Sequence, residues 1–302
     1  MIDEKKLPAN LPEFLRFFSQ HTRQSSSAHL QRTFARACTA SLASNLREKE
    51  ALTPADKCRY AALNVTGAMS FLNAPPSDPA TVLDTTVLQI YARMILGLPV
   101  SPELSQLPLA QCKCGFLLRD DPIHHFLSCK IMSQVFIIKR HNQLNVELQK
   151  IAQELGITWI NERVLANGKR IDSDFNLPQL AKPVGTDWSV VHPASASFCT
   201  SQAQSTPGYA AAYRAGRKTL KHDAQVRKEG GVFVPLIVET YGGFHPYVNK
   251  LLVEFRKTAL LTGQANVPDV ATMRNRLMAT LIKGNVAIIT NGLSKMTRRA
   301  AA

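Results

Sequence analysis

Four residues that can bind zinc lie between positions 112 and 129 of the chain. Cys112 and Cys114 are one residue apart, and His124 and Cys129 follow with four residues between them. Structural zinc sites are tetrahedral and use four thiolate or imidazole ligands. Gly115 follows the second cysteine and permits the tight turn that points two thiolates at one ion. The segment therefore predicts a structural Zn²⁺ site with the ligands Cys112, Cys114, His124 and Cys129.

His125 is an alternative ligand, because it is adjacent to His124 and spacing alone does not choose between them. A His-x4-Cys spacing places the two side chains about one helical turn apart. The pattern is a variant of the more common Cys-x2-Cys spacing. The other interpretation of this segment is a group of free cysteines beside a histidine pair at the start of a helix.

Asp172 and Asp187 are the second set of residues that could bind a metal. Two carboxylates from neighbouring strands can hold Mg²⁺, which prefers oxygen ligands. Such an ion polarises a phosphoryl oxygen and lowers the pKa of a bound water. Phosphodiester cleavage also needs a cation near the charged transition state, and Lys218 or Lys221 on the next helix could supply it. Spacing alone is weak support for a nuclease, because a chain of this length contains many Asp and Lys residues.

The charge of the chain favours a polyanionic partner. Its 302 residues include 36 Lys and Arg against 22 Asp and Glu, which gives a formal net charge of +14. A charge of this size favours nucleic acid first and an anionic membrane surface second. The basic residues that we expect to contact phosphates are Lys139, Arg140, Arg170, Arg214 and Arg217.

The sequence predicts an intracellular protein in a reducing compartment, with a nuclear location. The first residues lack the apolar run of a signal peptide. No uninterrupted apolar stretch approaches the length of a membrane span, so we expect no membrane partner. Six cysteines, three of them in one cluster, do not suggest a disulfide framework.

The apolar periodicity divides the chain into three parts. Residues 1–104 predict a helical region that could bind a protein partner, and residues 105–156 predict a zinc module followed by a helix. Residues 157–302 alternate between strand and helix patterns. The helices expected along the chain are 10–50, one starting at Pro54 with Thr53 as N-cap, 82–96, 133–155, 209–228, 246–261 and 270–283. The expected strands are 157–161, 186–191, 232–240 and 285–290.

The order of these segments resembles the C-terminal region of non-LTR retroelement polyproteins that carry a restriction-like endonuclease. The resemblance extends from about residue 67 to residue 243. The family has a Leu-Gly-Leu-Pro-like turn, a zinc motif ending in His-His-x-Leu-Ser-Cys, and then Arg-His-Asn, Arg-Pro-Asp, Asp-Val-Thr-Val, Lys-x-x-Lys-Tyr and Pro-x-x-Val-Glu-Thr-x-Gly. The matching segments of this chain are 96–99, 124–129, 140–142, 170–172, 187–190, 218–222 and 235–242.

The resemblance implies a PD-(D/E)xK nuclease fold, which is a central mixed sheet flanked by helices, together with a zinc module that helps to bind nucleic acid. It implies that Asp172 and Asp187 are metal ligands and that Lys218 is the catalytic lysine, with Lys221 as a close alternative. Glu239 either supports the metal or ends a buried strand. In such elements the nuclease nicks target DNA, and the exposed 3′ hydroxyl primes reverse transcription.

The chain departs from the family pattern at two of these positions. Ile171 replaces the proline of the first acidic motif, and His222 replaces the tyrosine. No reverse transcriptase palm with paired aspartates is present, so we expect no polymerase activity. Two hypotheses follow. The chain is a Mg²⁺-dependent DNA endonuclease, or it is a protein that binds DNA or RNA and keeps the fold without cleavage.

Overall fold

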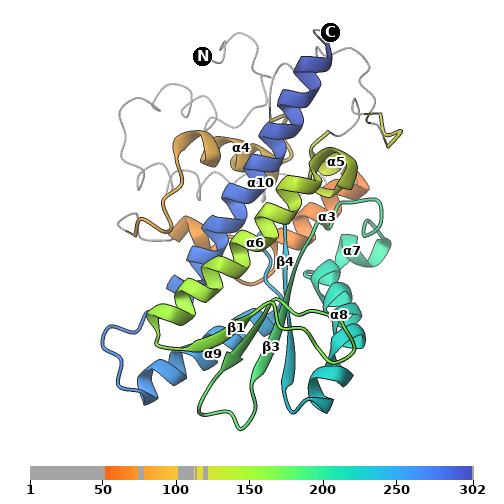
Figure 1. Cartoon of the computed structure of the whole chain (residues 1–302). Coiled ribbons are helices and arrows are strands. Elements are labelled where there is room, and N and C mark those ends of the chain that lie inside the picture. The colour runs from red at the N-terminus through yellow and green to blue at the C-terminus, as the bar shows by residue number, and fades with distance from the viewer. Residues whose placement is uncertain (1–51, 74–77, 101–111, 113, 118–121, 301–302) are drawn as a thin grey trace.

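The described residues form a mixed α/β structure in which helices surround a four-stranded sheet (Figure 1). The computed structural model describes residues 52–73, 78–100, 112, 114–117 and 122–300. The helical segment expected at residues 10–50 lies outside this part of the chain. The four-stranded mixed sheet and its flanking helices confirm the coarse prediction of the fold class.

Within the described residues, two α-helices precede the cysteine cluster; the start of the first and the end of the second agree with the prediction, whereas the second begins at Thr85 and not at Val82. Helix α3 (Pro54–Leu63) has Thr53 as its N-cap, and this side chain forms a capping box with the third residue of the helix. Helix α4 (Thr85–Leu96) ends at Gly97, which has a φ of 70°. This left-handed conformation is the usual reason for glycine at a helix end. A short 3-10 helix, η3 (Ser70–Asn73), lies between them.

The sheet has the strand order β1-β2-β3-β4, which is also the order along the chain. The first three strands are antiparallel neighbours, whereas β3 and β4 run parallel. The strands are β1 (Thr158–Asn161), β2 (Ser173–Asn176), β3 (Val184–Val191) and β4 (Val232–Glu239). Strand β2 was not among the expected elements.

Strand β4 forms an edge of the sheet, and this explains how it accommodates Pro235. The N–H of His245 donates to the carbonyl of Ile237, and the N–H of Glu239 donates to the carbonyl of Gly243. The odd-numbered peptide groups of β4 therefore face away from β3. Since Pro235 belongs to this set, its missing N–H removes no hydrogen bond between the two strands.

The two faces of the sheet pack against different helices. Trp188, Leu236 and Val238 join the main apolar cluster, which includes residues of α6, α9 and α10. On the opposite face, Ile237 packs against alanines of α8. Alternate residues of a strand point to opposite faces, so Asp187, which precedes Trp188, faces α8. These helices are α6 (Lys130–Glu154), α8 (Tyr209–Lys228), α9 (Pro246–Leu261) and α10 (Val270–Ala300).

The strand predicted at residues 285–290 is wrong, because these residues belong to the single long helix α10. Helix α10 packs against α4, α6, α9 and the short helix α5 (Pro122–Ser128) (Figure 1). A helix covered on most sides reads as a continuous apolar run, and it loses the 3.6-residue signal that distinguishes it from a strand. Gly284 allows α6 to approach closely, since a Cβ there would lie 2.6 Å from Cγ of Arg140.

Candidate functional site

The cysteine cluster forms a group of ligands that could bind a metal ion such as zinc. The ligand atoms of Cys112, Cys114, His125 and Cys129 all lie within 4.8 Å of one another. Sγ of Cys112 lies 3.8 Å from Sγ of Cys129, and Sγ of Cys114 lies 3.5 Å from Nε2 of His125. In a tetrahedral zinc site, ligand atoms at bond distances of about 2.0–2.3 Å lie about 3.5–3.8 Å apart. These two spacings fit this geometry, and the Sγ atoms of Cys114 and Cys129 are slightly further apart, at 4.0 Å.

The histidine ligand predicted from the sequence must be corrected from His124 to His125. Both residues belong to helix α5 (Pro122–Ser128), in which consecutive side chains point about 100° apart. Only one of them can therefore face the cysteines. The ring of His125 stacks on Phe116 at a centroid distance of 4.5 Å, which fixes its orientation toward the cluster.

Local structure brings the three cysteines together from two segments. Gly115 has a φ of 91° and turns the chain between Cys114 and Phe116. Cys129 is the N-cap of α6, where its sulfur accepts a hydrogen bond from the N–H of Met132 at 3.4 Å. Burial raises the pKa of the Cys112 thiol to about 11. Because zinc binds the thiolate, metal binding must release protons from the cluster.

His124 belongs instead to a chain of polar contacts at the C-terminal ends of β3 and β4. Its Nδ1 lies 2.6 Å from Nε2 of His192, and Nδ1 of His192 lies 2.7 Å from Oγ1 of Thr240. Asn285 of α10 donates to the carbonyl of Thr240 at 2.8 Å and accepts from Arg140 of α6 at 2.6 Å. This buried network connects the helix that carries the metal cluster to the sheet, to α6 and to α10.

Arg140 is one of the predicted phosphate contacts, but its side chain is buried in this network. It is only 2% exposed, and its stem packs against Gly284. Burial lowers the pKa of its guanidinium to about 9. The polar residues at 140–142 therefore serve different purposes, since the neighbouring His141 reaches the acidic site instead.

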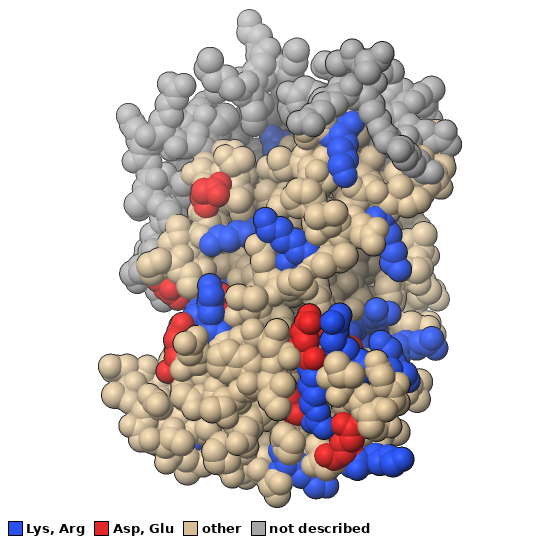
Figure 2. All heavy atoms as spheres, viewed as in Figure 1, with Lys and Arg blue, Asp and Glu red and all other residues tan. Residues whose placement is uncertain are grey.

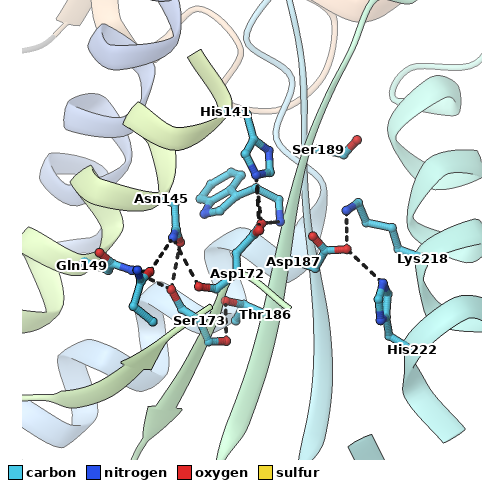
Figure 3. A network of polar contacts seen from close by, with 12 residues as sticks. His141, Asn145, Gln149, Asp172, Ser173, Thr186, Asp187, Ser189, Lys218 and His222 are labelled. Atoms are coloured by element: carbon cyan, nitrogen blue, oxygen red, sulfur yellow. Dashed lines mark hydrogen bonds and ion pairs between the residues drawn. The ribbon is translucent and has the colours of Figure 1, made fainter. Parts of the chain in front are cut away.

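The structure brings Asp172 and Asp187 together (Figure 3). Strand β2 pairs with β3 only as far as Thr186, so the next N–H groups of β3 have no partner in β2. Asp172, which precedes β2, accepts a hydrogen bond from the N–H of Trp188 at 2.6 Å. Its carboxylate thereby lies beside that of Asp187, and each influences the pKa of the other.

Helix α8 places a row of basic side chains on β3. Lys218 forms an ion pair with Oδ2 of Asp187, and Nε2 of His222 lies 3.3 Å from the same oxygen. Arg214 donates to Oγ of Ser189 at 3.0 Å. Residues four apart on a helix lie on one face, as do residues two apart on a strand. Arg214 and Lys218 are four residues apart on α8, and their partners Ser189 and Asp187 are two residues apart on β3, so the two pairs of side chains meet.

The acid pair is partly buried, and its electrostatic environment favours an additional cation. Burial and the neighbouring charge of Asp172 raise the pKa of Asp187, although Lys218 acts to lower it. Burial likewise lowers the pKa of the Lys218 ammonium despite its acidic partner. Against the effect of burial, the hydrogen bond and charge of His141 lower the pKa of Asp172. Two adjacent carboxylates with one partly desolvated lysine are a suitable setting for a divalent ion.

A polar row on α6 fixes the position of Asp172. Nε2 of His141 lies 3.3 Å from both carboxylate oxygens of Asp172. One turn later, Asn145 donates to the carbonyl of Asp172 at 3.4 Å and accepts from Ser173 at 2.9 Å. Gln149, another turn on, donates to Ser173 at 2.9 Å. Sequence reasoning missed His141 as a site residue, although the Arg-His-Asn segment was a signal for it.

His222 is the second site residue that sequence reasoning missed. Its side chain is 0% exposed, and neither ring nitrogen forms a hydrogen bond among the described residues. Burial, followed by the charges of Lys221 and Lys218, lowers the pKa of the imidazole to about 4. The ring is therefore neutral at physiological pH. The only sequence signal was its presence where the resembling family has tyrosine.

Two of the predicted catalytic residues lie away from the acid pair. Lys221 is exposed on α8, and Lys218 is the lysine placed at Asp187. Glu239 is four residues beyond Pro235, the residue paired with Asp187, which is roughly 13 Å along the strand. Its carboxylate accepts from the N–H of Ala211 at 3.0 Å at the start of α8. It thus ends a buried strand and caps a helix.

The remaining predicted phosphate contacts lie at the surface. Lys139, Arg170 and Arg217 are exposed, and Arg170 pairs with Glu162 at 3.1 Å. Figure 2 shows Lys and Arg side chains on the side of the molecule where α8 lies, interrupted by acidic ones. This surface is adjacent to the acid pair through Lys218 and Arg214 of the same helix.

The donor set at the acid pair fits Mg²⁺ through its two carboxylates. Among the described residues, only the Cys3His cluster brings three or more ligand atoms within 4.8 Å of one another. The acid pair is therefore not a complete protein cage. Mg²⁺ typically keeps several waters and uses one or two carboxylates together with substrate phosphates, so a cage is not required.

Comparison with known proteins does not assign this chain to a family. No protein-family model matches it, and no curated protein is similar to it. Within the described residues, no helix combines the length and apolar character needed to cross a membrane. The retroelement resemblance and the PD-(D/E)xK fold therefore remain proposals, to be judged on the residues themselves.

Proposed function

We propose that the chain is a metal-dependent DNA endonuclease derived from a non-LTR retroelement, which nicks DNA as in target-primed reverse transcription. The observation that supports this most is the meeting of Asp172 and Asp187 from separate segments of the chain, with Lys218 at Asp187. Two acids and a lysine at the junction of sheet strands are the set that the retroelement resemblance implies.

Each residue of the site has a role that follows from its position. Asp172 and Asp187 would hold Mg²⁺, which polarises a phosphoryl oxygen and lowers the pKa of water when bound. Lys218 is close enough to the pair to face the negative charge that develops on the phosphate. His141 holds the carboxylate of Asp172 in place from α6. Arg214 and the exposed cations of α8 would contact neighbouring phosphates.

The substitution of Ile171 for the family proline is compatible with this arrangement. Ile171 is buried with Leu165, Val226 and Phe233, and it packs closely against Gly185. Its backbone N–H donates to the carbonyl of Arg163 at 3.0 Å. The apolar side chain thus anchors the segment that presents Asp172.

The second candidate function is nucleic-acid binding without cleavage. The observation that favours it is the ion pair between Lys218 and Asp187, which occupies the carboxylate that a catalytic metal would need. In this case the zinc cluster and the basic face of α8 would still bind DNA or RNA. The two functions differ only in whether a divalent ion displaces the ammonium group.

A nicking assay on supercoiled plasmid separates the two functions. Asp172→Asn or Asp187→Asn should lower the nicking rate by roughly 100-fold or more, because each removes a charge that holds the ion. Asp223→Asn is the matched control, since Asp223 pairs with Arg227 elsewhere on α8. DNA binding should persist in all three variants. Wild-type protein that binds DNA but never nicks it with Mg²⁺ or Mn²⁺ would establish the binding-only function.

A further inference from the structure

His222 is a buried polar side chain beside the acid pair, and its position is suited to binding a ligand. Nε2 lies 3.3 Å from Oδ2 of Asp187. Neither nitrogen forms a hydrogen bond among the described residues, and the side chain is fully buried. A buried polar group without a hydrogen bond is destabilising and is usually explained by a function or by a bound ion. Figure 3 shows the ring pointing from α8 toward Asp187.

The other histidine of the site has a different environment. Nε2 of His141 forms a hydrogen bond with Asp172, so this nitrogen carries the proton. A nitrogen that donates N–H to a carboxylate has no lone pair for a metal. His141 therefore orients Asp172, whereas Nε2 of His222 is near Oδ2 of Asp187 without a hydrogen bond, and its lone pair can coordinate an ion there.

The spacing of His222 and Asp187 suits two ligands of one ion. Two ligand atoms about 2.1 Å from an ion and at right angles to each other lie about 3 Å apart, close to the observed 3.3 Å. The ammonium of Lys218 binds the same oxygen and marks a position that a cation can occupy. Lys218 and His222 are one helical turn apart, so both reach Asp187 from one face of α8.

We propose that His222 is a nitrogen ligand of the acidic metal site and that it makes this site favour a first-row transition-metal ion such as Mn²⁺ over Mg²⁺. The inference rests on the proposed function, because it requires an ion at Asp187. Imidazole suits transition metals, whereas Mg²⁺ takes oxygen ligands. Asp172, Asp187 and His222 are not as closely grouped as the Cys3His ligands. Asp172 therefore reaches the ion after a side-chain rotation or through a bound water.

Pulsed electron paramagnetic resonance tests the coordination directly in the wild-type chain. Protein with zinc already bound is titrated with Mn²⁺, and the spin-echo signal is examined for modulation by a coordinated ¹⁴N nucleus. We expect this modulation in the wild type and its loss in His222→Phe, in which the new ring still packs beside Phe233. His245→Asn, at the N-cap of α9 and outside the acid pair, is the matched control and should keep it. In His141→Asn, any Mn²⁺ that binds should still show the modulation. Asp187→Asn should abolish Mn²⁺ binding.

The outcomes distinguish this inference from the proposed function. Mn²⁺ bound at the acid pair without ¹⁴N modulation would overturn the role of His222 and leave the nuclease proposal intact. The same holds if the signal is lost in His141→Asn rather than in His222→Phe. No binding of either metal to the wild type would remove the acidic metal site itself, and the nuclease proposal with it.

Calorimetry provides a second measurement with the same proteins. The wild type should bind Mn²⁺ at least about 10-fold more tightly than Mg²⁺, and His222→Phe should lose most of this preference. Equal affinities of the wild type for the two ions would contradict the inference. If His222→Phe does not fold, the proposal is still tested by the wild type and by His141→Asn, because absence of the modulation in the first or its loss in the second overturns it.

Discussion

His124 and His125 are adjacent in sequence but belong to two different sites. His125 faces Cys112, Cys114 and Cys129, whereas His124 contacts His192 at the end of the sheet. Sequence spacing could identify the cluster because its cysteines are close together along the chain. It could not choose the histidine, because that choice depends on how α5 is rotated against the sheet.

The ligand assignment predicts different results for the two histidines. His125→Ala should reduce the zinc content of freshly purified, reduced protein well below one ion per chain, because the cluster loses a ligand. His124→Ala should keep about one zinc ion and lower stability through the lost contact with His192. Elemental analysis gives the zinc content, and thermal unfolding gives the stability. Zinc loss in His124→Ala alone would reverse the assignment.

Lys218 and Lys221 were alternatives for the catalytic lysine, and the structure distinguishes their positions. Lys218 reaches Asp187, whereas Lys221 is exposed one turn along the same helix. Under the proposed function, Lys218→Ala should slow plasmid nicking by about 100-fold, in line with the loss of one group that stabilises a transition-state charge. Lys221→Ala should change the rate little and weaken DNA binding slightly. A larger rate loss in Lys221→Ala would identify the other lysine as catalytic.

Helix α8 is positioned by Glu239 at one end of β4. The helix begins at Gly208, which provides no side-chain cap, and Glu239 accepts the N–H of Ala211 instead. Burial raises the pKa of Glu239 to about 7, although the helix N–H groups act to lower it. This contact explains how a residue distant from the acids can still determine where Lys218 and His222 lie.

The raised pKa of Glu239 predicts a pH dependence of stability. The folded state holds this proton more tightly than the unfolded chain, so its contribution is complete below about pH 4.5. It is lost as the pH rises through about 7. Glu239→Gln cannot ionise and should therefore be more stable than the wild type at pH 8, by on the order of 1–3 kcal/mol. Urea unfolding between pH 5 and 8 measures the difference, which should shrink toward pH 5.

The basic face of α8 predicts how DNA binding depends on salt. Arg214, Arg217 and Lys221 can be replaced together by Gln without touching Lys218. If all three contact phosphates of duplex DNA, the slope of log K against log salt should fall in magnitude by up to about 3. A matched control is Lys250 and Lys257 of α9, a helix at the other side of β4. A slope unchanged by the α8 variant would show that this helix does not face the nucleic acid.

The elements predicted well are those whose signals are local. Helix α8 begins and ends at Tyr209 and Lys228, and α9 at Pro246 and Leu261, as their periodicity and flanking residues predict. The short strand β2 and the end of α10 could not be predicted. The first contains polar residues buried by long-range contacts with α6, and the second is an apolar helix enclosed by other helices.

The three predicted parts of the chain share one apolar core. The main cluster contains Tyr91 of α4, Phe126 of α5, Leu148 of α6 and Trp188 of the sheet. Cys129 is also the N-cap of α6, and α6 carries His141 to the acid pair (Figure 3). From Cys129 to His141 the helix spans roughly 18 Å. The metal cluster is thus connected to the acidic site by a continuous helix.

This shared core predicts that zinc removal weakens the whole molecule rather than one module. Chelation of zinc should lower the midpoint of thermal unfolding, because metal binding contributes to folding. The midpoint should fall by the same amount whether unfolding is followed by the circular dichroism of the helices or by fluorescence. The fully buried Trp188 of the sheet contributes to the fluorescence. Two coincident transitions mean that the cluster and the sheet unfold together. Loss of helical signal at a temperature where the fluorescence is unchanged would show instead that the zinc segment is an independent unit.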